Sequence, residues 1–149
     1  MNLSRRALLS SSAAAAATAF FGGRVLADAD SVVMAIEEFT GGGGTAYSEL
    51  ISFELPAIAE NGNSVAMSVT VDSPMTDDDY VEAVMIFAGG NPNPEVATFH
   101  FTPLSGEANA STRMRLARTQ NVVAIAKLSN GDMHKVNKFV EVTVGGCGA

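Results

Sequence analysis

The feature that most constrains the fold of this chain is a regular alternation of apolar and polar residues. In the stretch SVAMSVTVD (residues 64–72), Val65, Met67, Val69 and Val71 fall on one side of an extended chain, and smaller or polar residues fall on the other. A period of two residues is that of a β-strand with one buried and one solvated face. The segment is therefore predicted to be a half-buried strand.

Similar segments recur along the chain, and short stretches rich in turn-forming residues separate them. The separating stretches are ENGN, DSP, GGNPNP, SGE and SNGD. The Asn130–Gly131 pair in the last of them is the strongest hairpin signal. The predicted strands span residues 51–55, 64–72, 81–88, 96–101, 110–117, 122–128 and 133–144.

This succession predicts an all-β fold, an immunoglobulin-like antiparallel β-sandwich over residues 45–144, with a small barrel as the alternative. The chain has one cysteine and no tryptophan, so it lacks the disulfide and the Trp typical of antibody domains. A length of 149 residues, 47% of them hydrophobic, suits one globular domain.

Before the sandwich, residues 28–44 are predicted to form a short helix and a glycine-rich linker. The stretch SVVMAIEEFTGGGG places Val33, Ile36 and Phe39 on one face of a helix over residues 31–39, with Ser31 as its cap. Four glycines then stop the helix. No Lys-Ser or Lys-Thr pair follows them, so the stretch does not match a phosphate-binding loop.

Residues 1–27 resemble an export signal. They combine a positively charged start, an apolar run over residues 13–21 and small residues before a predicted cut after Ala27. The paired Arg5 and Arg6 are typical of a twin-arginine signal, which would place the mature protein in the periplasm. An ordinary secretion signal and a membrane anchor are the alternatives, but a run of roughly 9 apolar residues is shorter than the ~20 that a spanning helix needs.

The charges of the chain are unevenly distributed. Residues 1–27 hold three of the nine Lys and Arg residues and none of the 16 acidic ones, so the remainder is strongly acidic. An acidic chain is not expected to bind nucleic acid. The basic residues after position 27 all lie in the last third: Arg113, Arg115, Arg118, Lys127, Lys135 and Lys138.

Most residues that could carry chemistry lack the partners they would need. His100 and His134 have no further ligands at metal-binding spacing, and Asp77–Asp79 lack the distal glutamate of a calcium loop. Both are predicted to be surface or structural features. No hydrolase motif is present. The methionines after position 27 are predicted to fill the core: Met34, Met67, Met75, Met85, Met114 and Met133.

The single cysteine, Cys147, stands two residues before the end of the chain, between glycines. In an oxidising compartment such a residue makes an intermolecular disulfide or serves as a reactive thiol; a frayed end without a role is the third alternative. Gly145, Gly146 and Gly148 predict a flexible arm over residues 145–149, which reaches at most about 10 Å beyond the last strand. A catalytic cysteine needs a rigid site instead, so the thiol is predicted to be acted upon.

Nearby basic residues could support that thiol. Arg113, Arg115 and Lys138 belong to the basic last third, and their charges would favour a thiolate and attract an anion to it.

Several stretches together resemble one known family, the SoxY sulfur carriers of the bacterial periplasmic thiosulfate-oxidising (Sox) system. They are LPAIAENG, VDSPMTDDDYV, NPNPEVATFHFTP, STRMRLARTQNVVAIAKLSNG and the terminal VTVGGCGA, and they extend over almost the whole chain after the signal. The family ends in Gly-Gly-Cys-Gly-Gly, and here Ala149 replaces the last glycine.

The resemblance implies an immunoglobulin-like fold, a heterodimer with SoxZ, no cofactor, and covalent sulfur intermediates on Cys147. It also implies transient partners: the haem enzyme SoxAX, which joins thiosulfate to the thiol, the hydrolase SoxB, and in some organisms the sulfur dehydrogenase SoxCD. We therefore expect a non-catalytic, exported carrier. The alternative is an exported immunoglobulin-like binding or structural module whose cysteine makes an intermolecular disulfide.

Overall fold

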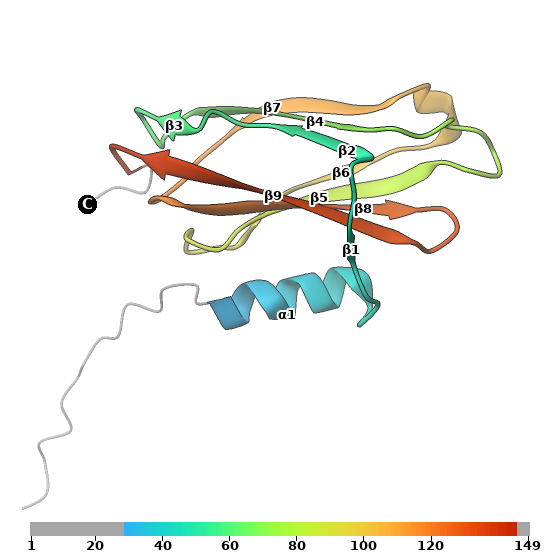
Figure 1. Cartoon of the computed structure of the whole chain (residues 1–149), viewed down its shortest axis with the longest axis horizontal. Helices are drawn as coiled ribbons and strands as arrows, with labels where there is room; N and C mark the ends of the chain where they lie inside the picture. The colour runs from blue at the N-terminus through green and yellow to red at the C-terminus, as the bar shows by residue number, and fades with distance from the viewer. Residues whose placement is uncertain (1–28, 146–149) are drawn as a thin grey trace, which may run out of the picture.

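The computed structural model describes residues 29–145, with side chains from residue 32 onward. Within these residues a helix precedes a series of strands (Figure 1). In chain order the elements are α1 (Ala29–Thr40), β1 (Ala46–Tyr47), β2 (Ile51–Glu54), β3 (Ile58–Ala59), β4 (Val65–Val71), β5 (Val81–Ala88), β6 (Glu95–His100), the 3-10 turn η1 (Pro103–Ser105), β7 (Ala108–Met114), β8 (Gln120–Leu128) and β9 (Met133–Val142).

The strands form two sheets that pack face to face. One has the order β1-β9-β8-β5-β6, with β3 also paired to β9, and the other has the order β2-β4-β7. The prediction of an immunoglobulin-like sandwich is confirmed, and the barrel alternative is wrong. Two pairings depart from a purely antiparallel arrangement, because β1 and β3 both run parallel to β9.

Alternating side chains from the two sheets make the main core. On β4, Val65, Met67, Val69 and Val71 are each at most 3% exposed, as their spacing predicts. Residues of β5 and β8 meet them from the other sheet, among them Ile86 and Val122 at 0% exposure. Burial of these aliphatic groups supplies the main stabilisation of the fold.

Helix α1 covers the outer face of the larger sheet (Figure 1). Ala35 packs with Phe87 and Ile125, and the ring of Phe39 meets that of Phe87 edge to face at 6.3 Å. The prediction that Val33 lies on this face is wrong, because Val33 is 51% exposed. The contacts instead follow the 3.6-residue repeat through positions 32, 35, 36 and 39, which leaves position 33 about 100° away.

The end of α1 explains two of the four glycines. Gly41 and Gly42 have φ values of 61° and 76°, which residues with a Cβ rarely adopt. Their N–H groups donate to the carbonyls of Glu38 (3.4 Å) and Glu37 (3.0 Å). This is a Schellman motif, so the first half of the predicted linker belongs to the helix end.

The hairpin predicted at Asn130–Gly131 joins β8 to β9. The N–H of Gly131 donates to the Leu128 carbonyl at 3.0 Å, and Gly131 has a φ of 91°. Asn130 keeps a negative φ, so the loop is a three-residue turn that closes with a left-handed glycine.

Three of the predicted core methionines, Met67, Met75 and Met114, are buried, and Met85 and Met133 are partly buried. The prediction is wrong for Met34, which is 67% exposed on the outer side of α1. Among the described residues, no helix has the length and apolarity needed to cross a membrane.

A glycine at the end of β5 allows α1 to approach the sheet. A Cβ placed on Gly89 would lie 2.6 Å from Cγ2 of Val32 but 3.8 Å from its Cβ. We expect Gly89→Ala to lower the free energy of unfolding by about 1–3 kcal/mol, because the stiff valine must move. Adding Val32→Ala should recover part of that loss in a denaturation double-mutant cycle, whereas strictly additive effects would show that the two residues do not touch.

Candidate functional site

The terminal thiol and its neighbours lie outside the described residues. This applies to the predicted site residues Cys147, Gly146 and Gly148, and to Arg5 and Arg6 of the predicted signal. The structure does describe the base from which the terminal segment leaves the sandwich. We call residues 142–145 the arm root.

The arm root extends the backbone pairing between β9 and the segment before β4. The N–H groups of Glu141 and Thr143 donate to the carbonyls of Ala57 and Ala59 at 2.9 and 3.0 Å. One step further, the Gly62 N–H donates to the Val144 carbonyl at 2.7 Å. The chain is therefore held by backbone hydrogen bonds as far as Val144.

A second segment, the connection between β7 and β8, holds the arm root from another side. The N–H of Leu116, which is 0% exposed, donates to the Gly62 carbonyl at 2.8 Å. The Thr119 hydroxyl accepts from the N–H of Val142 at 2.9 Å and lies 3.5 Å from its carbonyl. The two loops and the arm root thus form one hydrogen-bonded unit.

Gly145 lies against this connection rather than in open space. A Cβ built on Gly145 would overlap the carbonyl oxygen of Ala117, whereas one on Gly44 or Gly106 would meet nothing within 4 Å. The sequence predicts Gly145 as part of a flexible arm, and that role stays a prediction. The contact gives a separate, steric reason for glycine at position 145, since the Cβ of any other residue would meet the backbone oxygen of Ala117.

Two buried amide side chains fix the β7–β8 connection. Asn91 and Gln120 are each 8% exposed. Asn91 Oδ1 accepts from the Ala117 N–H at 2.9 Å and from Gln120 Nε2 at 3.1 Å, and its Nδ2 donates to the Arg115 carbonyl at 2.8 Å. Gln120 Oε1 accepts from the Gly90 N–H at 2.6 Å, and its Nε2 also donates to the Arg118 carbonyl at 3.1 Å.

Sequence reasoning missed this amide pair. Asn91 stands in the turn GGNPNP, where asparagine normally signals the turn itself, and Gln120 lies 29 residues away. The one local signal of the pair is Gly90, next to Asn91, because a Cβ on Gly90 would come within 2.8 Å of the Gln120 side chain.

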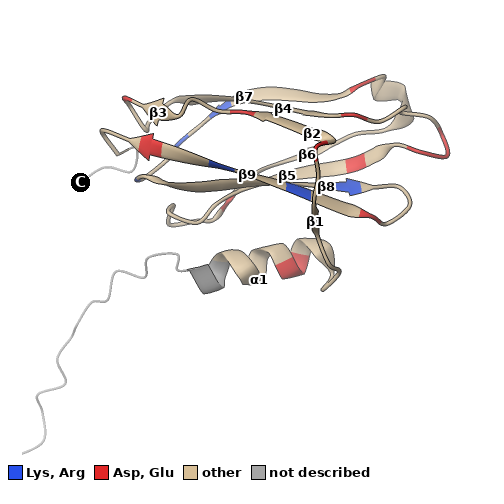
Figure 2. Ribbon diagram, viewed as in Figure 1, with Lys and Arg blue, Asp and Glu red and all other residues tan. Residues whose placement is uncertain are grey.

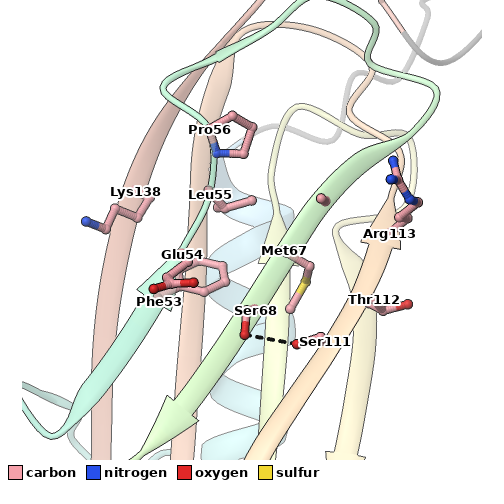
Figure 3. Close-up of a pocket in the computed structure, with 11 residues that line it drawn as sticks. Phe53, Glu54, Leu55, Pro56, Met67, Ser68, Ser111, Thr112, Arg113 and Lys138 are labelled. Atoms are coloured by element: carbon pink, nitrogen blue, oxygen red, sulfur yellow. Dashed lines mark hydrogen bonds between the residues drawn. The ribbon is translucent and has the colours of Figure 1, made fainter.

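Two of the three predicted basic residues line one groove of about 740 Å³ (Figure 3). Lys138 of β9 and Arg113 of β7 lie on opposite sides of it, and Glu54 of β2 lies near Lys138. Arg115 does not line the groove. The predicted support of the Cys147 thiolate by Arg113, Arg115 and Lys138 stays a prediction, because Cys147 lies outside the described residues.

The groove lining combines apolar side chains, among them Leu55 and Met67, with small polar ones such as Ser68 and Ser111. Ser111 donates its hydroxyl to Ser68 at 3.0 Å, and Nη1 of Arg113 lies 3.3 Å from Ser64 Oγ. Exposed cations here can attract an anion through space, but nothing in this geometry encloses one. Figure 2 shows the basic residues on β7, β8, β9 and the β7–β8 connection, whereas acidic residues are spread over the described chain, β9 included.

The remaining polar candidates are surface or structural features. His100 is exposed, and Asp77–Asp79 form an exposed turn in which the Thr76 N–H donates to the Asp79 carbonyl at 2.9 Å. His134 is partly buried, and its Nδ1 has no hydrogen-bond partner in the described part of the chain. Across residues 29–145, no group of three or more His, Cys, Asp or Glu side chains could hold a metal ion.

Comparison with known proteins points to one family. A family model described as sulfur oxidation protein SoxY matches residues 36–147. The solved structure of the sulfur carrier protein SoxY from Chlorobium limicola f. thiosulfatophilum is similar, with a TM-score of 0.67 and 30% identity over 78% of this chain and 100% of that chain.

More distant similarities concern the fold alone. Superoxide reductase (neelaredoxin) from Ignicoccus hospitalis has a TM-score of 0.56 at 17% identity, over 63% of this chain and 80% of that one. Superoxide reductase from Nanoarchaeum equitans has 0.53 at 16%, over 64% and 96%. A search of curated proteins finds no match.

The buried amide pair should be important for stability. Gln120→Leu leaves the partly buried Gly90 N–H without an acceptor and removes the buried hydrogen bond to Asn91, so the free energy of unfolding should fall by about 1–3 kcal/mol in urea denaturation. The neighbouring Asn121 is exposed, and Asn121→Leu should change it by no more than about 0.5 kcal/mol. Equal effects of the two substitutions would contradict the assigned role of Gln120.

Proposed function

This chain belongs to the SoxY family of sulfur oxidation proteins, and from that premise we propose that it is a sulfur carrier that holds thiosulfate-derived intermediates covalently on Cys147. The carrier presents these intermediates to the enzymes of thiosulfate oxidation. It does not itself catalyse a reaction.

One observation carries this proposal: the match to the family ends at residue 147, which is the only cysteine of the chain. A covalent sulfur carrier needs one nucleophilic sulfur, and the chain offers no second candidate. The 30% identity with a protein described as a sulfur carrier supports the same function.

The proposed chemistry balances in two steps. In loading, an S–S bond forms between Cys147 Sγ and the outer sulfur of thiosulfate, the thiol loses its proton, and two electrons pass to the haem enzyme SoxAX. In unloading, SoxB adds water to the terminal sulfonate group. The S–S bond to that group breaks, sulfate leaves, and a persulfide stays on Cys147. Where SoxCD is present, it oxidises this remaining sulfur.

The position of the arm root suits this task. It lies at one end of the sandwich, where β9 ends (Figure 1), so a segment that leaves from it can enter the site of another protein. We propose that the working form is a periplasmic heterodimer with SoxZ and without a cofactor. Residues 1–27, with Arg5 and Arg6, are its twin-arginine export signal.

Intact mass measures loading directly. After incubation with thiosulfate, SoxZ and SoxAX, the wild-type chain should gain the mass of a thiosulfate adduct, and Cys147→Ser should gain none. If the wild-type chain forms only a disulfide-linked dimer that Cys147→Ser abolishes, the chain is a cross-linked binding module and the carrier proposal fails.

The groove charges should affect the rate of loading rather than its extent. At low ionic strength, Arg113→Gln with Lys138→Gln should slow adduct formation by about two- to tenfold, and added salt should reduce the difference. Lys127→Gln is the control, because Lys127 lies outside the groove and its Nζ is 3.2 Å from Oε2 of Glu82. If the control slows loading equally, net charge rather than the groove matters.

A further inference from the structure

The contacts around the arm root carry an inference about the direction in which the terminal segment leaves the sandwich. We propose that Asn91, Gln120 and Ala117 are positioning residues for residues 146–149. In this arrangement the buried amide pair fixes the Ala117 carbonyl, and that carbonyl fixes the path of the chain at Gly145. This inference rests on the proposed function, because only a carrier gives the terminal segment the role of an arm.

In the first step, the Asn91 side chain binds the peptide groups that precede Ala117 by hydrogen bonds. Its Oδ1 binds the Ala117 N–H at 2.9 Å, and its Nδ2 binds the Arg115 carbonyl at 2.8 Å. One side chain therefore fixes two neighbouring points of the connection. Because Asn91 is 8% exposed, water cannot readily replace either bond.

The second step is the support that Gln120 gives to Asn91. Its Nε2 donates to the Asn91 Oδ1 at 3.1 Å and to the Arg118 carbonyl at 3.1 Å, while its Oε1 accepts from the Gly90 N–H at 2.6 Å. The amide pair thus bridges the β5–β6 turn and the β7–β8 connection. A satisfied buried network of this kind has one favoured arrangement.

The third step is steric. The Val144 carbonyl is bound by the Gly62 N–H at 2.7 Å, and the next residue lies against the Ala117 carbonyl. Gly62 is in turn bound to Leu116, which precedes Ala117. The chain at Gly145 is thus confined by contacts that all involve the β7–β8 connection, either directly or through Gly62.

Direction matters for a carrier whose sulfur must enter the site of an enzyme. A displacement of about 1 Å in a reacting group can cost on the order of 100-fold in rate. A side chain at position 145 would push the chain away from Ala117 and re-aim the segment. Loss of Asn91 would let the connection itself shift.

The direction can be measured without any partner enzyme. A nitroxide attached to Cys147 broadens the backbone amide signals of the residues it approaches, and NMR reads this pattern over residues 29–145. Gly145→Ala and Asn91→Ala should change which amides are broadened. Their controls, Gly44→Ala and Asn109→Ala, should keep the wild-type pattern, since Gly44 has open space around it and Asn109 is exposed.

A wild-type pattern in Gly145→Ala would overturn the inference. This variant changes no core contact, so its result stands even if Asn91→Ala fails to fold. A changed pattern in Gly145→Ala together with an unchanged one in folded Asn91→Ala would overturn the role of the amide pair.

Loading provides a second readout. Gly145→Ala should be loaded by the haem enzyme about ten- to a hundredfold more slowly, while a small thiol reagent reacts at the wild-type rate. Equal loading of Gly145→Ala and wild type would contradict the inference. If the wild-type chain is never loaded, the proposed function fails, and the broadening pattern still decides the inference.

Discussion

The backbone pairing of β9 is the interaction on which the rest of this structure depends. Along one edge β9 pairs with β8 from Gln120 to Lys127, and along its other edge it pairs with β1 and β3. Val140 of the same strand is 0% exposed in the core between the sheets. Because β9 runs directly into the arm root, the backbone hydrogen bonds of this strand hold the base of the candidate site.

Around the arm root, hydrogen bonds fix the arrangement of the chain, whereas apolar packing does so elsewhere in the sandwich. Backbone bonds through Gly62 and side-chain bonds from Asn91 and Gln120 join three loops that are distant in the sequence. Their burial makes the network costly to break and favours one arrangement. The site therefore combines a fixed base with a glycine-rich end, and these two properties come from different residues.

Local patterns were sufficient for most of the fold. Alternation over β4 and β5 and the Asn130–Gly131 turn depend on neighbouring residues, so the sequence predicts them well. The side of the helix that faces the sheet was harder: apolar residues at 32, 33 and 36 allow more than one face, and packing on Phe87 selects among them. β1 and β3 have two residues each, too few for a periodic signal. The Asn91–Gln120 pair and the Gly145 contact arise from tertiary structure, which no local pattern contains.

The short parallel strands beside β9 have a consequence for self-association. A bare strand edge offers unpaired N–H and C=O groups to any other extended chain. β1 and β3 occupy those groups on β9 at His134–Lys135 and at Glu141–Val142. Without them, the outer edge of β9 would be open along its whole length for a second copy of the chain to pair with. Two dipeptide strands thus limit edge-to-edge pairing between copies of this chain.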